Sequence, residues 1–185
     1  RLEIHLSKED EAWSDALLAR WRPAPAVLIH TSSALPEKNL PQQTAQQVVD
    51  SLKTSLTIVQ FPGVALLSGT DTIAPMPRIR QSAALIQRLQ GVITVDSFPG
   101  HLARAVGTPA VVIFGPSNPN TFGHDGNDNI RVSSCPPCAD TPRRKTCERS
   151  LCLEEVTAEH ILRGVRSVMY FRLPEVSLEK SGDIP

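Results

Sequence analysis

The residues from Gly91 to Pro116 constrain the fold of this 185-residue chain more than any other stretch. Residues 92–95 are all β-branched, as is typical of a parallel strand that is covered on both faces. A helix is expected over residues 99–106, where Pro stands at the start and Gly follows the end. Residues 110–114 predict the next strand. The stretch therefore predicts a β-α-β unit, whose ligand crevice lies at the carboxyl ends of the strands.

The turn between this strand and this helix is the first candidate ligand site. Asp96 and Ser97 follow the strand directly and precede the helix. A helix N-terminus attracts anions, and a carboxylate can accept hydrogen bonds from sugar hydroxyls. We expect Asp96 and Ser97 to face an anion or a sugar; the alternative for Asp96 is a helix N-cap without a ligand.

The rest of the chain alternates strand and helix signals. Short apolar runs predict strands at residues 26–29 and 56–60, and helical periodicity predicts helices at 42–52, 78–90 and 158–169. On the 78–90 helix the apolar stripe consists of Ile79, Ala83, Ile86 and Leu89. This alternation favours an α/β fold, a Rossmann-like open parallel sheet with helices on both faces.

A further helix is expected near the N-terminus, over residues 8–21. Trp13, Leu17, Leu18 and Trp21 recur on it at helical spacing and predict one apolar face. We expect this face to pack on a neighbouring domain. From Leu173 onward the sequence is typical of a frayed tail.

A second polar loop follows the predicted strand at residues 26–29. It contains Ser32, Ser33 and Lys38, and hydroxyls and an ammonium group are what a phosphate-bearing ligand needs. The alternative is an ordinary solvated loop. If the ligand interpretation holds, Lys38 and Asp96 share one cleft.

The four cysteines lie within 18 residues of one another, at Cys135, Cys138, Cys147 and Cys152. Four thiolates at this spacing can surround one tetrahedral ion, zinc or iron, in a structural site that leaves no open position for catalysis. Two disulfides or unmodified thiols are the alternatives. The first residues lack the apolar core of a secretory signal, so we expect a cytoplasmic protein, in which disulfides are disfavoured.

Composition excludes some classes of function. The formal net charge is zero and only 4% of the residues are aromatic, which argues against a nucleic-acid partner. The alternative is a nucleic-acid-binding module that is stabilised by a metal ion at the cysteines. The basic run at residues 143–145 is its only support. No apolar run approaches the roughly 20 residues that cross a bilayer.

Several of these motifs together resemble the C-terminal half of glycosyltransferase family 9, the heptosyltransferase type with the two-domain GT-B fold. Residues 95–103 resemble a sequence motif of the family. In that motif an Asp is followed by Ser or Thr, then usually by Gly, then by two variable residues and His-Leu; here Phe98 stands at the position of the Gly. Residues 107–109 and 114–119 resemble its Gly-x-Pro and Gly-Pro-Thr elements. Residues 30–41 resemble its hydroxyl-rich loop and Lys-x-Trp-Pro element. Cys-Pro-Pro-Cys also occurs in many members.

The resemblance, which spans residues 27–169, implies an inverting transfer of a sugar from a nucleoside diphosphate. The sugar is expected to be heptose, the donor ADP-heptose, and the acceptor a lipopolysaccharide core or related lipid glycan. No catalytic metal is implied. Carried over to this chain, Lys38 and α-helix N-terminal groups neutralise the diphosphate, and Asp96 holds sugar hydroxyls. The donor-binding residues implied are Ser32, Ser33, Lys38, Met76, Asp96, Ser97, Phe98, Gly100 and His101.

The resemblance also implies that catalysis needs more than this domain. No catalytic residue is expected in this chain, because the family's general base and acceptor site belong to an N-terminal domain. Residues 1–22 are expected to form a helix and linker that come from that domain. Residues 23–172 are expected to form the nucleotide-sugar-binding domain, with the cysteine-rich loop at 135–152. Residues 173–185 are expected to form a tail. Without its N-terminal domain the chain is expected to be inactive. A full enzyme is expected to touch the membrane peripherally. The alternative is a non-catalytic nucleotide-sugar-binding or interaction module.

Overall fold

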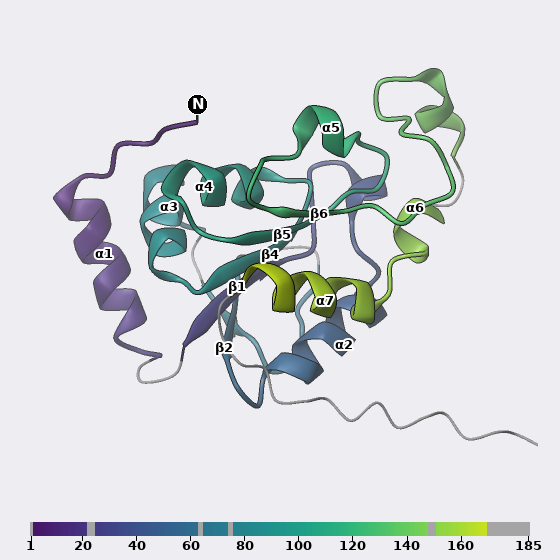
Figure 1. The fold of residues 1–185 in the computed structure, drawn as a ribbon. Coiled ribbons are helices and arrows are strands. Elements are labelled where there is room, and N and C mark those ends of the chain that lie inside the picture. The colour runs from purple at the N-terminus through teal and green to yellow at the C-terminus, as the bar shows by residue number, and fades with distance from the viewer. Residues whose placement is uncertain (1, 22–24, 63–64, 74–75, 148–150, 170–185) are drawn as a thin grey trace, which may run out of the picture.

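A six-stranded parallel sheet forms the middle of the molecule (Figure 1). The structure, a computed structural model, describes residues 2–21, 25–62, 65–73, 76–147 and 151–169. The strand order is β3-β2-β1-β4-β5-β6. The expected α/β fold with a Rossmann-like parallel sheet is confirmed.

The order of the strands reverses between β1 and β4. The strands are β1 (Ala26–His30), β2 (Thr57–Gln60), β3 (Asp71–Thr72), β4 (Gly91–Val95), β5 (Ala110–Ile113) and β6 (Asp128–Ile130). From β1 the chain moves outward to β2 and β3, and then returns to place β4 on the other side of β1. In open α/β sheets a ligand crevice is expected at such a reversal, at the carboxyl ends of these two strands.

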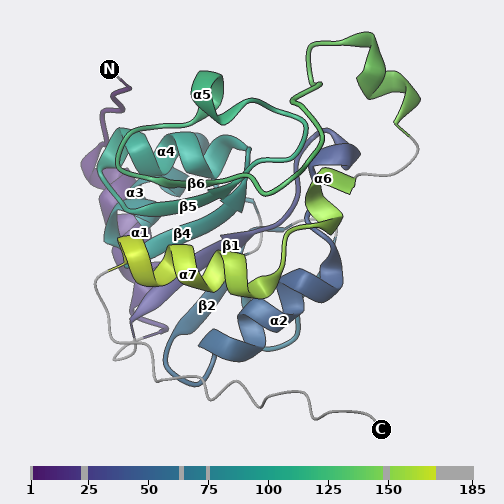
Figure 2. The ribbon, with the colours of Figure 1, turned by 45° about the vertical axis from the view of Figure 1, so that its right-hand side comes forward.

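Helices cover both faces of the sheet. They are α1 (Lys8–Leu18), α2 (Gln42–Leu52), α3 (Ile79–Arg88), α4 (Phe98–Val106), α5 (Pro119–Phe122), α6 (Leu151–Glu154) and α7 (Ala158–Val168), with short 3-10 helices η1 (Pro36–Lys38) and η2 (Pro142–Thr146). α2 and α7 lie on one face, whereas α3 and α4 lie on the other (Figures 1 and 2). None of the described helices is long and apolar enough to cross a membrane.

The strand sequences explain why both faces are covered. Along β1, Val27 and Ile29 join the core beneath α2 and α7, while Ala26 and Leu28 join the core beneath α3 and α4. Successive side chains of a strand point to opposite faces, so a strand that is apolar at every position needs cover on both.

The N-terminal helix packs on this domain. α1 lies against α3, and Trp13 and Trp21 are partly buried against the core of the same sheet. An ion pair of 2.6 Å joins Asp15 of α1 to Arg88 of α3. Whether α1 also contacts another domain stays a prediction. The predicted tail at 173–185 lies outside the described residues.

Candidate functional site

Two hydrogen bonds within the polar loop after β1 hold its two ends together. The amide of Leu40 donates to the carbonyl of Thr31 at 2.9 Å, and the amide of Ser33 donates to Oδ1 of Asn39 at 2.8 Å. These bonds bring the end of the loop back beside its beginning. As a result Lys38, in the short helix η1, lies near the carboxyl end of β1.

Lys38 and Asp96 form an ion pair at the crevice between β1 and β4. Nζ of Lys38 lies 2.6 Å from Oδ2 of Asp96, and the two side chains are only 16% and 8% exposed. The two residues come from loops after neighbouring strands and are far apart in the sequence. The two side chains therefore lie together at the carboxyl ends of neighbouring strands, and the cleft that we expect them to share with a ligand stays a prediction. Ser32, from the same loop as Lys38, is also buried.

Asp96 leads directly into the N-terminus of α4. Ser97 is the N-cap residue, but its side chain makes no capping hydrogen bond to the described helix. The hydroxyl of Ser97 is thus not used to cap α4. The first amide of the helix, at Phe98, has no partner within an α-helix either. Together these groups present hydrogen-bond donors beside the ion pair.

Gly100 turns the side on which a side chain would stand toward the sheet, and the expected role of its backbone in ligand binding stays a prediction. A Cβ at this position would lie 3.3 Å from Val112 and 3.4 Å from Thr94. Its amide donates to the carbonyl of Ser97 at 3.2 Å. Gly100 therefore allows α4 to pack closely on β4 and β5.

Phe98 belongs to an aromatic cluster at the carboxyl ends of β1 and β2. Its ring stacks on Phe61 with centroids 5.8 Å apart and packs edge-on against His30 at 5.5 Å. Phe61 is fully buried and His30 is 7% exposed. Burial lowers the pKa of His30 to about 4, so this imidazole is neutral at physiological pH.

His101 contacts a second histidine that the sequence did not indicate. Nδ1 of His101 in α4 lies 2.7 Å from Nε2 of His124, in the loop between α5 and β6. Burial, followed by the nearby His101 and Arg104, lowers the pKa of His124. In the sequence His124 lies within a Gly/Asn/Asp-rich loop with no motif, so nothing there connected it to His101.

Met76 follows β3, the strand at the edge of the sheet, and its expected contact with the nucleotide stays a prediction. Met76 is 46% exposed and lies between β3 and α3, and β3 is separated from β4 by β2 and β1. At the end of β2, Gln60 is used internally. Its Oε1 accepts from the amide of Leu67 at 3.2 Å and from the hydroxyl of Thr70 at 3.1 Å, so it orders the following loop.

The four cysteines line one cavity of about 220 Å³. They are thiols with no disulfide among them, and the loop is fixed to the sheet by a bond of 2.8 Å from the amide of Cys138 to the carbonyl of Pro116. Burial and the neighbouring Cys138 raise the pKa of the Cys152 thiol. Among the residues that the structure describes, no three metal-binding side chains are close enough together to hold an ion.

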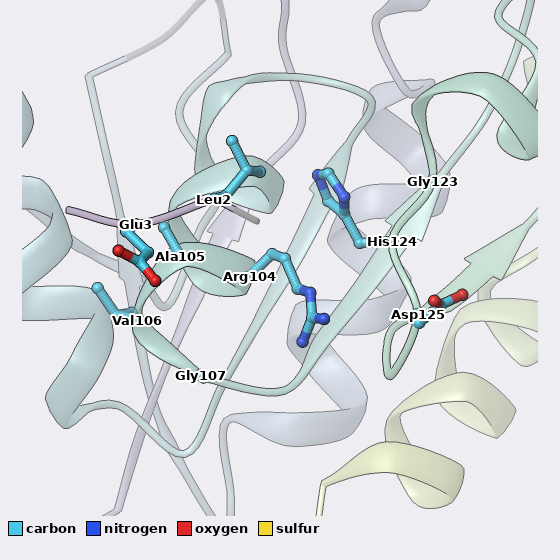
Figure 3. A pocket seen from close by; sticks show the side chains of 9 residues that line it. All are labelled: Leu2, Glu3, Arg104, Ala105, Val106, Gly107, Gly123, His124 and Asp125. Carbon is cyan, nitrogen blue, oxygen red and sulfur yellow. The ribbon is translucent and has the colours of Figure 1, made fainter.

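A larger cavity, of about 860 Å³, lies along the outer side of α4. Leu2 and Glu3 of the N-terminal segment, Arg104 of α4, and His124 and Asp125 line it; Figure 3 shows Arg104 and His124 facing the same space. None of the expected donor-binding residues belongs to its lining. His124, through its contact with His101, links this cavity to α4.

Comparisons with known proteins agree with this geometry. A model of glycosyltransferase family 9 (heptosyltransferase) matches residues 3–153. Lipopolysaccharide heptosyltransferase 1 of Pseudomonas aeruginosa is 33% identical over 84 residues, which are 44% of this chain and 23% of that protein. The resemblance inferred from the sequence motifs is thereby confirmed.

Solved structures share the fold. The glycosyl transferase family 9 structure from Veillonella parvula has a TM-score of 0.78 and 20% identity, covering 91% of this chain and 53% of that one. The dodecameric iron-containing heptosyltransferase TibC of enterotoxigenic E. coli, in complex with ADP-D-beta-D-heptose, has a TM-score of 0.62 and 18% identity, covering 78% and 45%. This chain thus spans about half the length of these structures, and less of the curated relative.

The burial of the ion pair predicts a specific loss of stability. Lys38→Met leaves the Asp96 carboxylate buried without its cation, and we expect the free energy of unfolding to fall by about 1–3 kcal/mol. Lys53→Met is the matched control, because Lys53 pairs with Asp50 at the same 2.6 Å but with side chains 43% and 49% exposed. Its effect on stability should be much smaller than that of Lys38→Met, because an exposed pair is screened by solvent. Equal losses in urea denaturation would contradict the role given to burial.

The buried imidazole predicts a pH dependence of stability. The unfolded chain binds a proton at His30 below its usual pKa of 6.5, and the folded chain does so only below about 4. The stabilisation is therefore fully present above pH 6.5 and is lost as the pH falls toward 4. Between pH 7 and pH 4, wild type should lose about 3 kcal/mol more than His30→Phe. Parallel stability curves for the two proteins, measured by urea denaturation, would show that His30 titrates normally.

Proposed function

Because this chain belongs to glycosyltransferase family 9, the heptosyltransferase family, we propose that it is the donor-binding domain of an enzyme that transfers heptose from ADP-heptose. The observation that carries the proposal is the Lys38–Asp96 ion pair beside the N-terminus of α4. It supplies positive charge, a carboxylate and hydrogen-bond donors in the crevice of a Rossmann-like sheet, where such folds bind nucleotides.

The chemistry of these groups suits a diphosphate leaving group. An ammonium group has three N–H donors, and one bond to Asp96 leaves two for phosphate oxygens. The hydroxyl of Ser97 and the first amide of α4 add donors where the helix dipole is positive. Negative charge grows on the diphosphate as its bond to the sugar breaks, and donors already fixed in place stabilise that charge.

Asp96 has two roles in this proposal. In the free protein it holds the Lys38 ammonium in the crevice, which reduces the side-chain entropy that donor binding must remove. With the donor bound, its carboxylate accepts hydrogen bonds from sugar hydroxyls. Ser32 and Ser33 complete the proposed site on the β1 side. Met76 is proposed only as part of the outer, nucleotide side, since it lies at the far end of the sheet edge.

The acceptor site is assigned to the half of the family's two-domain enzymes that has no counterpart in this chain. The proposal assigns a lipopolysaccharide core or related lipid glycan, and the general base of an inverting transfer, to an N-terminal acceptor domain. It follows that this chain alone binds donor without transferring the sugar. A lipid acceptor places the full enzyme in the cytoplasm, in peripheral contact with the membrane. The curated relative, named a lipopolysaccharide heptosyltransferase, supports this choice of acceptor.

A non-catalytic nucleotide-sugar-binding or interaction module is the second candidate. The aromatic cluster favours it, because the Phe98 side chain stands at the start of α4, where a glycine would let a phosphate approach most closely. Gln60, at the end of β2, also uses its side-chain oxygen for the loop that follows, so that this oxygen is not available to a nucleotide ribose. The two candidates differ in whether donor binds at all, and in which groups hold it.

Donor binding tests the proposal. We expect wild type to bind ADP-heptose in calorimetry and Lys38→Met to bind it about 10–100-fold more weakly, as loss of a charge-assisted contact predicts. Lys53→Met should bind like wild type. Circular dichroism at the assay temperature ensures that each variant is folded, and Ser97→Ala, with an expected loss of about fivefold, provides a milder change. Failure of wild type to bind at millimolar donor would favour the non-catalytic interaction module.

The cysteine cavity supports a separate proposal of a structural zinc or iron ion. The donor set of four thiols fits a tetrahedral ion, and the structurally similar heptosyltransferase TibC is an iron-containing protein. The four cysteine side chains must move closer together to bind the ion, and the bound ion then holds the cysteine-rich loop in place.

Metal content tests this proposal. Protein purified without chelators should contain about one zinc or iron ion per chain, and the double variant Cys135→Ser, Cys138→Ser should contain none. Chelation should lower the melting temperature of wild type but not of the double variant. Metal-free wild type with four titratable thiols would overturn the proposal.

A further inference from the structure

The contact between His101 and His124 joins two separate elements of the fold. His101 lies in the first turn and a half of α4, on the same helix as the proposed diphosphate site, and His124 comes from the loop between α5 and β6. The ring centroids are 5.0 Å apart and the rings are inclined at 77°. A nitrogen–nitrogen distance of 2.7 Å requires one hydrogen between the two atoms.

Counting protons shows what this contact permits. Two neutral imidazoles carry two N–H hydrogens, and the shared bond uses one of them. One of the two outer nitrogens is then bare. A single additional proton fills that position, so that both outer nitrogens donate and the shared bond survives. A second additional proton would put two donors face to face and break the contact.

The charges around the pair favour one proton rather than two. The loss of solvent, the neighbouring His101 and Arg104 of α4 all oppose charge on His124, and they lower its pKa. Asp125, beside His124, and Asp96, at the end of β4, act in the opposite direction. Glu3 of the N-terminal segment lines the adjoining cavity with Arg104. His30, a buried imidazole near this end of the sheet, stays neutral with a pKa of about 4.

We infer that His124 is a positioning residue for His101: it fixes the orientation of the His101 ring toward a diphosphate at the N-terminus of α4, and the pair takes up one proton when that diphosphate binds. The inference rests on the proposed function. A phosphate oxygen needs an N–H on the outer nitrogen of His101. When His101 donates the inner N–H to His124, its outer nitrogen is the bare one, so an added proton is needed to place an N–H there. His124 remains the acceptor of the inner N–H and shares the charge.

Two variants of His124 distinguish a role in orienting the His101 ring from a role in filling space. Gln keeps a hydrogen-bonding group that accepts from His101 but does not titrate, whereas Leu keeps the bulk and removes the acceptor. We use ADP-ribose as the probe, because both of its phosphates are esterified and do not titrate near neutral pH. His124→Leu should bind ADP-ribose about tenfold more weakly than wild type, and His124→Gln should bind within about threefold. His5→Gln, at an exposed position, is the matched control.

Calorimetry in buffers of different ionisation enthalpy measures the proton directly. Near pH 7.5, wild type should take up between about half a proton and one proton per ADP-ribose bound. In the free protein, ¹⁵N NMR of the imidazoles should show the His101 Nδ1 signal shifted by its hydrogen bond in wild type and released in His124→Leu. Circular dichroism verifies that the variants are folded.

The outcomes distinguish this inference from the function on which it rests. If wild type binds no ADP-ribose at any pH, the donor-binding function fails and the inference with it. If wild type binds, but His124→Leu binds equally well or no proton is taken up, the inference alone is overturned. Weak binding by Leu, recovery by Gln and proton uptake by wild type together support it.

Discussion

The ion pair between Lys38 and Asp96 is the interaction on which the functional account depends. It exists because the strand order reverses between β1 and β4, so that the loops after two neighbouring strands meet over one crevice. Removing two charges from water is costly, and a buried pair is seldom the most stable way to fill such a position. A pair at the end of the sheet, with one side chain 16% exposed, is better explained by a ligand that uses the same charges.

The surrounding elements fix this pair in place by ordinary packing. Gly100 lets α4 approach the sheet, which sets the position of the helix N-terminus beside Asp96. The Thr31–Leu40 and Ser33–Asn39 hydrogen bonds close the opposite loop. The two charged groups of the site are therefore each held by a packed or hydrogen-bonded element of the fold.

Much of the fold followed from local sequence patterns. β-branched and apolar runs predicted β1, β2, β4 and β5. That Lys38 and Asp96 lie close together followed from the rule that the carboxyl ends of parallel strands lie at the same edge of a sheet. What escaped prediction depends on tertiary contacts. β3 is only two residues long, and Ile79 fits an apolar stripe but is 56% exposed, because it stands at the first turn of α3.

Other features depend on neighbours that the local sequence does not show. The small side of Gly100 serves contact with Val112 and Thr94. Trp13 and Trp21 of α1 are partly buried against the core on the side of α3. His124 carried no signal at all, since only the folded chain brings it to His101.

The most direct test of the central claim is a map of where a donor binds. Amide NMR spectra of this chain recorded during titration with ADP-heptose should show the largest shifts at Ser97, Phe98 and the loop residues 31–40, with little change in the exposed face of α7. Shifts confined to the cavity of Arg104 and Asp125, or absent at millimolar donor, would contradict a donor site built on Lys38 and Asp96.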